Sequence, residues 1–332
     1  MESNPTIKLV TRRELLRTSA VLAGGALAAR FYPATLVRAA AAGYPQQAPA
    51  ADPLTAMRAQ FGGVPIQPQK LTDSITLLSG PGGNVVVLNG ADGKLMGDNF
   101  VQPAWPHLKE ALDNIGKAPV KTAIDTHWHF DHSDNNASLR AAGATLVAHV
   151  NTKKRMSENH TLAVLNLTFS PSSADALPQQ TFTQKHKIAM NGETVSLVHV
   201  PPAHTDSDIY IHFEKANVLQ SGDVFFNGFY PYIDTGTGGS LSGMIAGATK
   251  LLAVADDNTK IVPGHGPLGN KADLLKYRDV LSTVRDRLQK LKTSGKTVQE
   301  AVAAKPLADL DPAWGKGLFD SDTFIQIAYP AL

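Results

Sequence analysis

Apolar positions follow two different spacings from about residue 75 onward. Short apolar runs bounded by glycine, proline or aspartate predict strands, and apolar positions three and four residues apart predict helices. The predicted strands cover residues 75–78, 84–88, 94–96, 120–125, 144–149, 194–200, 208–213, 218–220 and 260–262. The predicted helices cover residues 106–115, 135–142, 240–255 and 272–291, whereas residues 161–181 show no clear period. Antiparallel strands come first and later alternate with helices, so we expect an α+β fold in which helices cover stacked sheets.

The N-terminal residues have a different character. Arg12 and Arg13 are followed by two leucines and by a run rich in alanine and glycine at 18–29. That run is shorter than the roughly 20 apolar residues that span a bilayer, and small residues at 37–43 offer cleavage sites. The stretch resembles a twin-arginine export signal.

This resemblance predicts the domain organisation and location of the chain. We expect residues 1–42 to be a signal peptide read by the twin-arginine export machinery. The mature protein would then be periplasmic, with no stable membrane insertion. Residues 43–68, rich in Pro, Gln, Ala and Gly, predict a linker or arm, and residues 69–332 predict a single domain that ends in helices.

Charge and cysteine content narrow the possible partners. The chain has 31 basic and 29 acidic residues; six of the basic and two of the acidic ones lie in residues 1–42. The remainder therefore carries 25 basic and 27 acidic residues, a net charge of −2, which argues against a nucleic-acid partner. The chain has no cysteine, so disulfides and thiolate metal ligands are excluded. Any transition metal must be held by His, Asp or Glu.

Four potential metal ligands lie within six positions of the chain. His127 and His129 are two residues apart, so in an extended segment their side chains leave the backbone on the same side. Asp131 and His132 follow directly and, if the chain turns there, point at a second position nearby. Such a segment can serve two metal ions that activate water for hydrolysis. By itself the cluster could also be a solvated histidine-rich loop.

Three later residues supply partners for this cluster. His204, Asp223 and His265 each follow a predicted strand directly. Strand ends are where rigid elements hold converging functional side chains. The sequence therefore offers seven ligands for two metals. The other histidines lack partner spacing and are expected to be structural or surface groups: His107, His149, His160, His186, His199 and His212.

The ordered set of ligands resembles that of the metallo-β-lactamase superfamily over roughly residues 70–290. Asp98 matches the acidic residue that this family places after its early hairpin strands to support the site from behind. The resemblance implies an αββα sandwich with the metals in a cleft at one edge of the sheets. It also implies a division of the ligands: His127, His129 and His204 for one metal, Asp131, His132 and His265 for the other, and Asp223 as the bridge.

The resemblance implies a dinuclear metal-dependent hydrolase. Two divalent ions, most simply zinc but with iron or manganese also suited to these ligands, would lower the pKa of a shared water. The resulting hydroxide would attack an ester, thioester, lactone or amide-like bond, and the metals would stabilise the oxyanion that forms. Asp131 is the predicted catalytic residue, which orients the hydroxide and later accepts its proton.

Position 223 and the C-terminus bear on the choice within the superfamily. An aspartate there, in a chain without cysteine, excludes the zinc–thiolate β-lactamases and resembles glyoxalase II and the lactonases. However, only 67 residues follow His265, and the basic substrate clamp of glyoxalase II is not identifiable among them. Three alternatives stay open: a class B3-like β-lactamase, an iron-dependent redox enzyme, and a non-catalytic exported metal-binding partner protein.

An aromatic segment follows Asp223 directly. Residues 225–232 read Phe-Phe-Asn-Gly-Phe-Tyr-Pro-Tyr, and a glycine-rich stretch at 235–239 comes next. This segment predicts one wall of the cleft, and hence a small-molecule substrate with an apolar part. The alternative is that these aromatic residues belong to the core.

Overall fold

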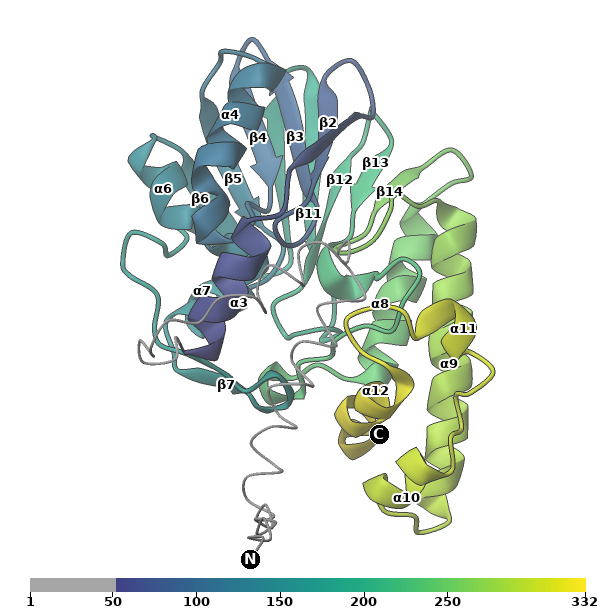
Figure 1. Cartoon of the computed structure of the whole chain (residues 1–332). Helices are drawn as coiled ribbons and strands as arrows, with labels where there is room; N and C mark the ends of the chain where they lie inside the picture. Colours follow the sequence, from purple (N-terminus) through teal and green to yellow (C-terminus); the bar gives the residue numbers. More distant parts are fainter. Residues whose placement is uncertain (1–51) are drawn as a thin grey trace, which may run out of the picture.

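Two β-sheets lie face to face at the centre of the molecule, with helices on both outer sides (Figure 1). The computed structural model describes residues 52–332, so the predicted signal peptide and the beginning of the predicted linker lie outside the described residues. The predicted α+β class and αββα sandwich are confirmed. Because both faces of each sheet need an apolar cover, the helices have to lie outside and the sheets against each other.

The first sheet has seven strands in the order β1-β2-β3-β4-β5-β6-β9. The strands from β1 to β4 pair antiparallel, and those from β4 to β9 pair parallel. Parallel neighbours need a crossover connection, which α4 supplies between β4 and β5, and α6 between β5 and β6. The strands are β1 (Gln67–Lys70), β2 (Ile75–Ser79), β3 (Val85–Gly90), β4 (Gly93–Gly97), β5 (Val120–Asp125), β6 (Thr145–His149) and β9 (Gln180–Phe182).

The second sheet has five strands in the order β10-β11-β12-β13-β14. All neighbours pair antiparallel except β13 and β14, which are parallel and joined through α8. The strands are β10 (Lys185–Met190), β11 (Glu193–His199), β12 (Ile209–Phe213), β13 (Val218–Gln220) and β14 (Lys260–Val262). A separate hairpin is formed by β7 (His160–Leu162) and β8 (Leu167–Phe169).

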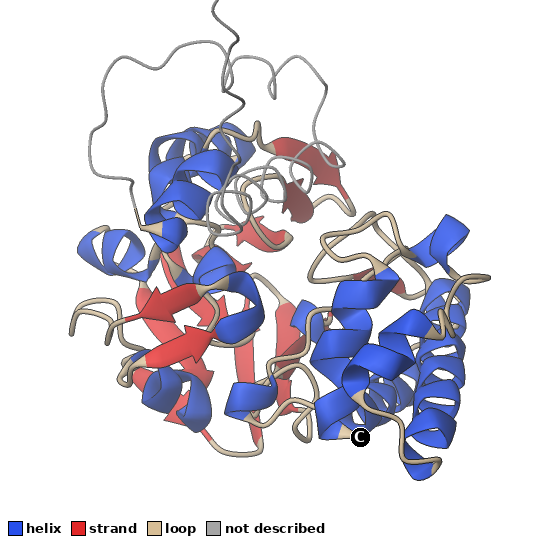
Figure 2. Cartoon of the chain, turned by 60° about the horizontal axis from the view of Figure 1, so that its bottom comes forward, coloured by secondary structure: helices blue, strands red, loops and turns tan. Residues whose placement is uncertain are grey.

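The helices cover the outer faces of the two sheets, and the helical C-terminal part gathers on one side (Figure 2). The α-helices are α3 (Pro53–Gly62), α4 (Trp105–Ile115), α5 (Phe130–Ser133), α6 (Asn136–Ala141), α7 (Val150–Met156), α8 (Leu241–Val254), α9 (Lys271–Thr293), α10 (Val298–Ala303), α11 (Asp311–Trp314) and α12 (Ser321–Ala328). The 3-10 helices are η1 (Gln102–Ala104), η2 (Ala163–Leu165), η3 (Gly222–Val224), η4 (Thr235–Thr237) and η5 (Tyr329–Ala331).

Alternation along the strands divides the apolar core into two layers. In β3, Val86 and Leu88 belong to the cluster between the two sheets, whereas Val85 and Val87 pack on the helical side. Successive strand residues point to opposite faces, so a strand with no polar position must be covered on both. This explains why the short all-apolar runs in the sequence form central strands.

Parts of the chain differ from the sequence-based expectation. Residues 53–62, within the predicted linker, form α3, which begins with an Asp52 side chain that accepts hydrogen bonds from the first turn. Residues 161–181 contain β7, β8 and the start of β9, although they show no clear period. These elements bury few apolar residues, so tertiary contacts rather than hydrophobic periodicity determine them.

Within residues 52–332, no helix combines the length and the apolar character needed to cross a bilayer.

Candidate metal centre

All seven predicted ligands come together at one edge of the two sheets. His127 and His129 lie in the loop that follows β5, and the short helix α5 turns Asp131 and His132 toward the same place. The remaining three lie in the loop between β11 and β12, in η3 after β13, and directly after β14: His204, Asp223 and His265. Rigid strands thus present ligands that are far apart in the sequence to a common point.

The first group consists of His127, His129, His204 and Asp223, whose ligand atoms all lie within 4.8 Å of one another. Nε2 of His204 is 2.8 Å from Nδ1 of His129. Oδ2 of Asp223 is 3.5 Å from Nε2 of His204 and 3.9 Å from Nε2 of His127.

The second group consists of Asp131, His132 and His265. Nε2 of His265 lies 3.2 Å from Oδ2 of Asp131 and 3.3 Å from Nε2 of His132. Asp223 reaches this group too, because its Oδ1 is 3.1 Å from Nε2 of His132 and its Oδ2 is 3.5 Å from Nε2 of His265. The two groups therefore divide as the resemblance to the superfamily implies, with Asp223 between them, and their role as metal ligands stays a prediction.

Hydrogen bonds on the far side of three histidines determine which ring nitrogen faces the cluster. Nδ1 of His132 is 2.9 Å from Asp98 Oδ2, and Nδ1 of His204 donates to the carbonyl oxygen of Tyr232 at 2.8 Å. Nε2 of His129 is 3.3 Å from Oδ2 of Asp234. In a neutral imidazole, the nitrogen that donates a proton leaves a lone pair on the other nitrogen. When neutral, each ring can thus direct a lone pair into the cluster, as metal ligation requires.

His127 follows the same rule through a hydroxyl group. Thr126 Oγ1 donates to Asp98 Oδ2 at 2.9 Å, and the same hydroxyl lies 3.1 Å from Nδ1 of His127, from which it can accept. Nε2 of His127 is buried and has no hydrogen-bond partner among residues 52–332. An unpaired buried acceptor is costly, and a metal ion at this position would satisfy it. The residues present therefore fit a transition-metal site built from His and Asp.

Burial keeps two histidines of the first group, His127 and His204, neutral. It lowers the pKa of His204 to about 4 and the pKa of His127 well below its usual value. Neutral imidazole is the form that binds metal. These two rings are therefore ready to bind a cation without first releasing protons.

The second group has the opposite electrostatics. Burial alone would raise the pKa of Asp131, but His132 and His265 lower it to about 2. Burial would lower the pKa of His265, but Asp223 and Asp131 raise it to about 9. At neutral pH, without a metal, His265 therefore carries a proton and pairs with ionised carboxylates. A metal that binds here has to displace that proton.

Two glycines allow the backbone to approach the ligands closely. A Cβ atom on Gly83 would lie 2.0 Å from Cε1 of His132, and one on Gly264 would lie 1.9 Å from Oδ1 of Asp223. Real Cβ atoms do not approach heavy atoms so closely. Glycine is therefore required at both positions if these ligands are to keep their places.

Carboxylates behind the ligands support the histidines, and only one of them was predicted from the sequence. The predicted one is Asp98, which accepts hydrogen bonds from His132, from Thr126 and from the side-chain amide of Gln220. Asp234 was not predicted, because it follows the aromatic segment with no distinctive spacing. Nor was Asp208, which accepts from the backbone N–H of His204 at 2.7 Å.

The aromatic segment (residues 225–232) is divided between core and site. Phe225 and Tyr230 are fully buried core residues. The ring of Phe226 stacks on His265 at 5.3 Å, and the ring of Tyr232 lies 5.9 Å from His204. Phe229 is partly exposed. Part of the segment thus lies beside the predicted ligands and the rest belongs to the core; that the former part forms a cleft wall stays a prediction.

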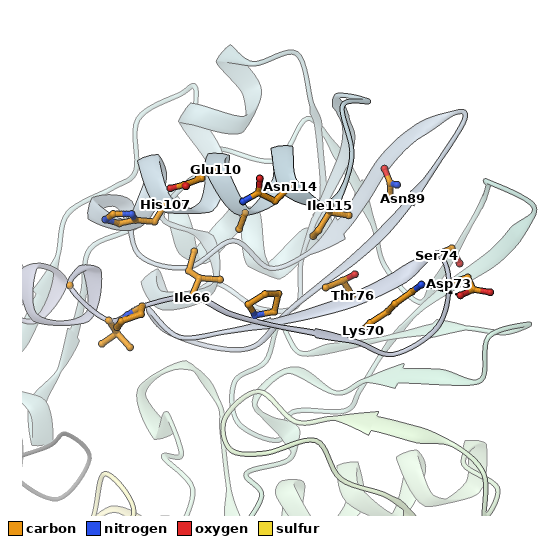
Figure 3. A pocket seen from close by; sticks show the side chains of 15 residues that line it. Ile66, Lys70, Asp73, Ser74, Thr76, Asn89, His107, Glu110, Asn114 and Ile115 are labelled. Atoms are coloured by element: carbon orange, nitrogen blue, oxygen red, sulfur yellow. Dashed lines mark hydrogen bonds and ion pairs between the residues drawn. The ribbon is translucent and has the colours of Figure 1, made fainter.

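The other histidines of the described chain lie outside the two groups. His149 and His199 stack in parallel at 3.9 Å, and His160 packs on Trp128 at 4.6 Å. His107 lines a groove of about 760 Å³ between β1 and α4 (Figure 3). None of the seven predicted ligands lines this groove, so it is separate from the metal cluster.

Comparison with known proteins agrees with this site and fold. The sequence profile described as the metallo-beta-lactamase superfamily matches residues 76–265, more than half of the chain. The chain belongs to this superfamily, whose members include hydrolases. A comparison with curated protein sequences found no match.

Solved structures share the fold at low sequence identity. A metallo-beta-lactamase from Pontibacter korlensis is 18% identical with a TM-score of 0.53, covering 65% of this chain and 99% of that one. The B3 metallo-beta-lactamase BLEG-1 is 22% identical with a TM-score of 0.51, covering 60% of this chain and 94% of its own. The inverting sec-alkylsulfatase Pisa1 from Pseudomonas sp. is 14% identical with a TM-score of 0.62, covering 86% of this chain but only 53% of its own. Superfamily membership and a His and Asp cluster that could hold metal together indicate an enzyme of the hydrolase type.

Proposed function

We propose that the protein is a dinuclear metal-dependent hydrolase. The observation that carries this proposal is the convergence of seven His and Asp side chains in two groups that share Asp223. Two bound divalent ions, for which zinc is our first choice, would lower the pKa of a water molecule and polarise the bond to be cleaved.

The chain's own residues would hold and orient the reacting groups. The first group would hold one ion through neutral imidazole nitrogens, and the second would hold the other through His132, His265 and the Asp131 carboxylate. The Asp131 side chain is 12% exposed, more than that of any other predicted ligand except His265. Because its pKa is held at about 2, it is ionised at neutral pH and can accept a hydrogen bond from water or a proton from it.

We propose an ester, thioester, lactone or amide-like substrate with an apolar part. The position of Phe226 and Tyr232 beside the histidines supports this choice. A secondary alkyl sulfate is a further candidate, because the fold similarity to the sulfatase Pisa1 extends over 86% of the chain. β-Lactams remain candidates as well, since structures of β-lactamases share the fold.

The proposal is tested by loading metal-free protein with zinc, manganese or iron and assaying thioester, lactone, β-lactam and secondary alkyl sulfate substrates. We expect turnover of at least one class, abolished by chelation and by His132→Ala. His186→Ala is the matched control, because His186 lies on β10 outside both groups. Full metal loading without turnover would favour a metal-binding partner protein, and oxygen consumption by the iron form alone would favour a redox enzyme.

We also propose that the protein is exported to the periplasm by the twin-arginine route. Arg12 and Arg13 support this, although they lie outside the described residues. The route moves folded proteins, so the site could be filled before translocation. We expect the protein in the periplasmic fraction and retention in the cytoplasm when both arginines are replaced by lysine; unchanged export of that variant would refute the proposal.

A further inference from the structure

One phenylalanine of the aromatic segment touches both ligand groups. The ring of Phe226 stacks on His265 at 5.3 Å with an interplanar angle of 19°. On the first group, the same ring lies 6.0 Å from His204. Phe226 is only 4% exposed, so it forms part of the floor beside the cluster rather than its rim.

Phe229 packs on Phe226, the ring that stacks on the most exposed of the ligands. Among the seven predicted ligands, the side chain of His265 is the most exposed, at 25%. Phe229 packs edge-on against Phe226, with ring centroids 5.8 Å apart, and is itself partly exposed. A substrate that enters beside His265 would therefore meet Phe226 and, packed against it, the partly exposed ring of Phe229.

Phe229 is held in place by a residue that lies outside the region matched by the superfamily profile. A Cβ atom on Gly317 would lie 2.4 Å from Cβ of Phe229 and 2.6 Å from its Cγ. Gly317 thus supports the ring directly and leaves no room for a side chain. It lies beyond residues 76–265, which the superfamily profile matches.

The segment around Gly317 is itself firmly attached to the aromatic segment. The backbone N–H of Tyr230 donates to the carbonyl oxygen of Trp314 at 3.1 Å, and its hydroxyl donates to Asp311 at 3.1 Å. The Tyr230 ring stacks on Phe324 at 4.9 Å. Phe319 packs on the Tyr232 ring at 5.8 Å. Residues 311–324, here called the C-terminal segment, therefore hold the aromatic segment by backbone, polar and ring contacts.

We propose that the C-terminal segment determines which apolar groups the metal cluster accepts, by holding Phe229 against Phe226 through Gly317. The substrate class this implies carries an acyl or alkyl chain next to the reacting bond. The inference rests on the proposed function for the identity of the site. Gly317 acts as a positioning residue, and Phe229 is the surface that contacts the substrate.

The test measures ligand binding, so that it does not depend on turnover. Straight-chain alkyl carboxylates of increasing length are titrated into the metal-loaded full-length protein by calorimetry, since a carboxylate is a general ligand for divalent metals. In the unmodified protein, we expect affinity to rise by about fourfold for each buried methylene. Phe229→Ala should flatten this dependence on chain length, and Gly317→Ala should reduce it because the new methyl group displaces the ring.

A double variant separates positioning from a general loss of structure. If Gly317 acts through Phe229, the variant carrying both Phe229→Ala and Gly317→Ala should bind each carboxylate as Phe229→Ala does. Lys316→Ala, at the exposed neighbouring position, is the control and should keep the dependence of the unmodified protein. Metal content and melting temperature of each variant report on folding.

Two results would overturn the inference. One is an affinity that does not depend on chain length in the unmodified protein. The other is a loss in Gly317→Ala that is equal for short and long chains or adds to that of Phe229→Ala. A protein that binds metal and carboxylates with the expected dependence, yet hydrolyses nothing, would contradict the proposed function and leave this inference standing.

Discussion

The Nδ1 atom of His132 lies 2.9 Å from Oδ2 of Asp98, and both side chains are completely buried. Asp98 adopts a positive φ of 63°, a strained conformation for a residue other than glycine. Such strain persists only where the surroundings hold it in place. Here the carboxylate fixes the orientation of a predicted ligand and also accepts from the Thr126 hydroxyl.

This relationship predicts the effect of Asp98→Asn. The amide keeps the shape of the side chain but removes the negative charge that orients the His132 N–H. We expect metal affinity to fall by about 10–100-fold, the usual cost of losing such a partner. Competition with a chromogenic chelator measures the affinity. Asp286→Asn, at an exposed position on α9, is the control; an equal effect in both variants would contradict the role of Asp98.

The contact between Asp234 and His129 predicts a loss of metal affinity that is confined to the ion of the first group. Asp234 contacts Nε2 of His129 and is held by the Thr237 hydroxyl at 2.5 Å. In Asp234→Ala, we expect the first group to bind its metal about 10-fold more weakly or worse, while the second group is unaffected. Stepwise metal titration followed by mass spectrometry would show one tight and one weakened ion. Equal weakening of both ions would show that Asp234 acts through the general structure instead.

The glycine that faces His132 predicts a loss in the second group. In Gly83→Ala, the methyl group would overlap the imidazole ring, so His132 has to move. We expect the number of tightly bound metals to fall from two to one. Gly63→Ala is the control, because its Cβ would meet nothing closer than 3.7 Å. Full metal binding by Gly83→Ala would mean that the backbone gives way instead of the ring.

Metal binding should depend on pH in a defined direction. In the metal-free protein, the pKa of His265 is about 9, because Asp223 and Asp131 outweigh the effect of burial. Below this pH the ring holds a proton that competes with the metal, so affinity should rise from about pH 7 to about pH 9 and then level off. Calorimetry in buffers of different ionisation enthalpy would count the released protons. Affinity that does not change over this range would contradict the assignment of His265 as a ligand.

Removing the metals should lower the melting temperature. A ligand at about 100 times its dissociation constant stabilises the folded state by about 2.7 kcal/mol. For a domain of this size, that corresponds to a decrease of roughly 5–10 °C on chelation. Differential scanning calorimetry with and without chelator measures the change, and zinc added back should restore the melting temperature. An unchanged melting temperature would indicate that no metal binds the folded chain.

The central strands and the outer helices α4, α6, α8 and α9 could be predicted from the sequence, whereas other peripheral elements such as β10 and α3 could not. The run at β3 is apolar at every core position and has no alternative to a doubly covered strand. The edge strand β10 alternates Lys185 and Lys187 with half-buried residues, which leaves little apolar signal. The helix α3 buries only Leu54 and Gly62 on a sequence that resembles a linker. Contacts with residues that are distant in the sequence stabilise such elements, and a local sequence pattern carries no signal of those contacts.

The site shows the same difference between local and distant information. His127, His129 and Asp131 could be found because three potential metal ligands lie within five positions of the chain. Asp234 and the carbonyl oxygen of Tyr232 reach the ligands only after the loop that follows β13 folds back over the histidines. No spacing rule connects Asp234 to His129, which lies 105 positions earlier in the chain. The support of Phe229 by Gly317 depends in the same way on the folded C-terminal segment.

The number of metal ions held by one chain tests the account most directly. Native mass spectrometry of the purified protein, loaded with zinc and dialysed, would give this number. The account predicts two ions per chain, falling when His132, Asp223 or His204 is replaced by alanine. A chain that saturates at one ion, or that retains none, would contradict the dinuclear centre and with it the proposed hydrolase.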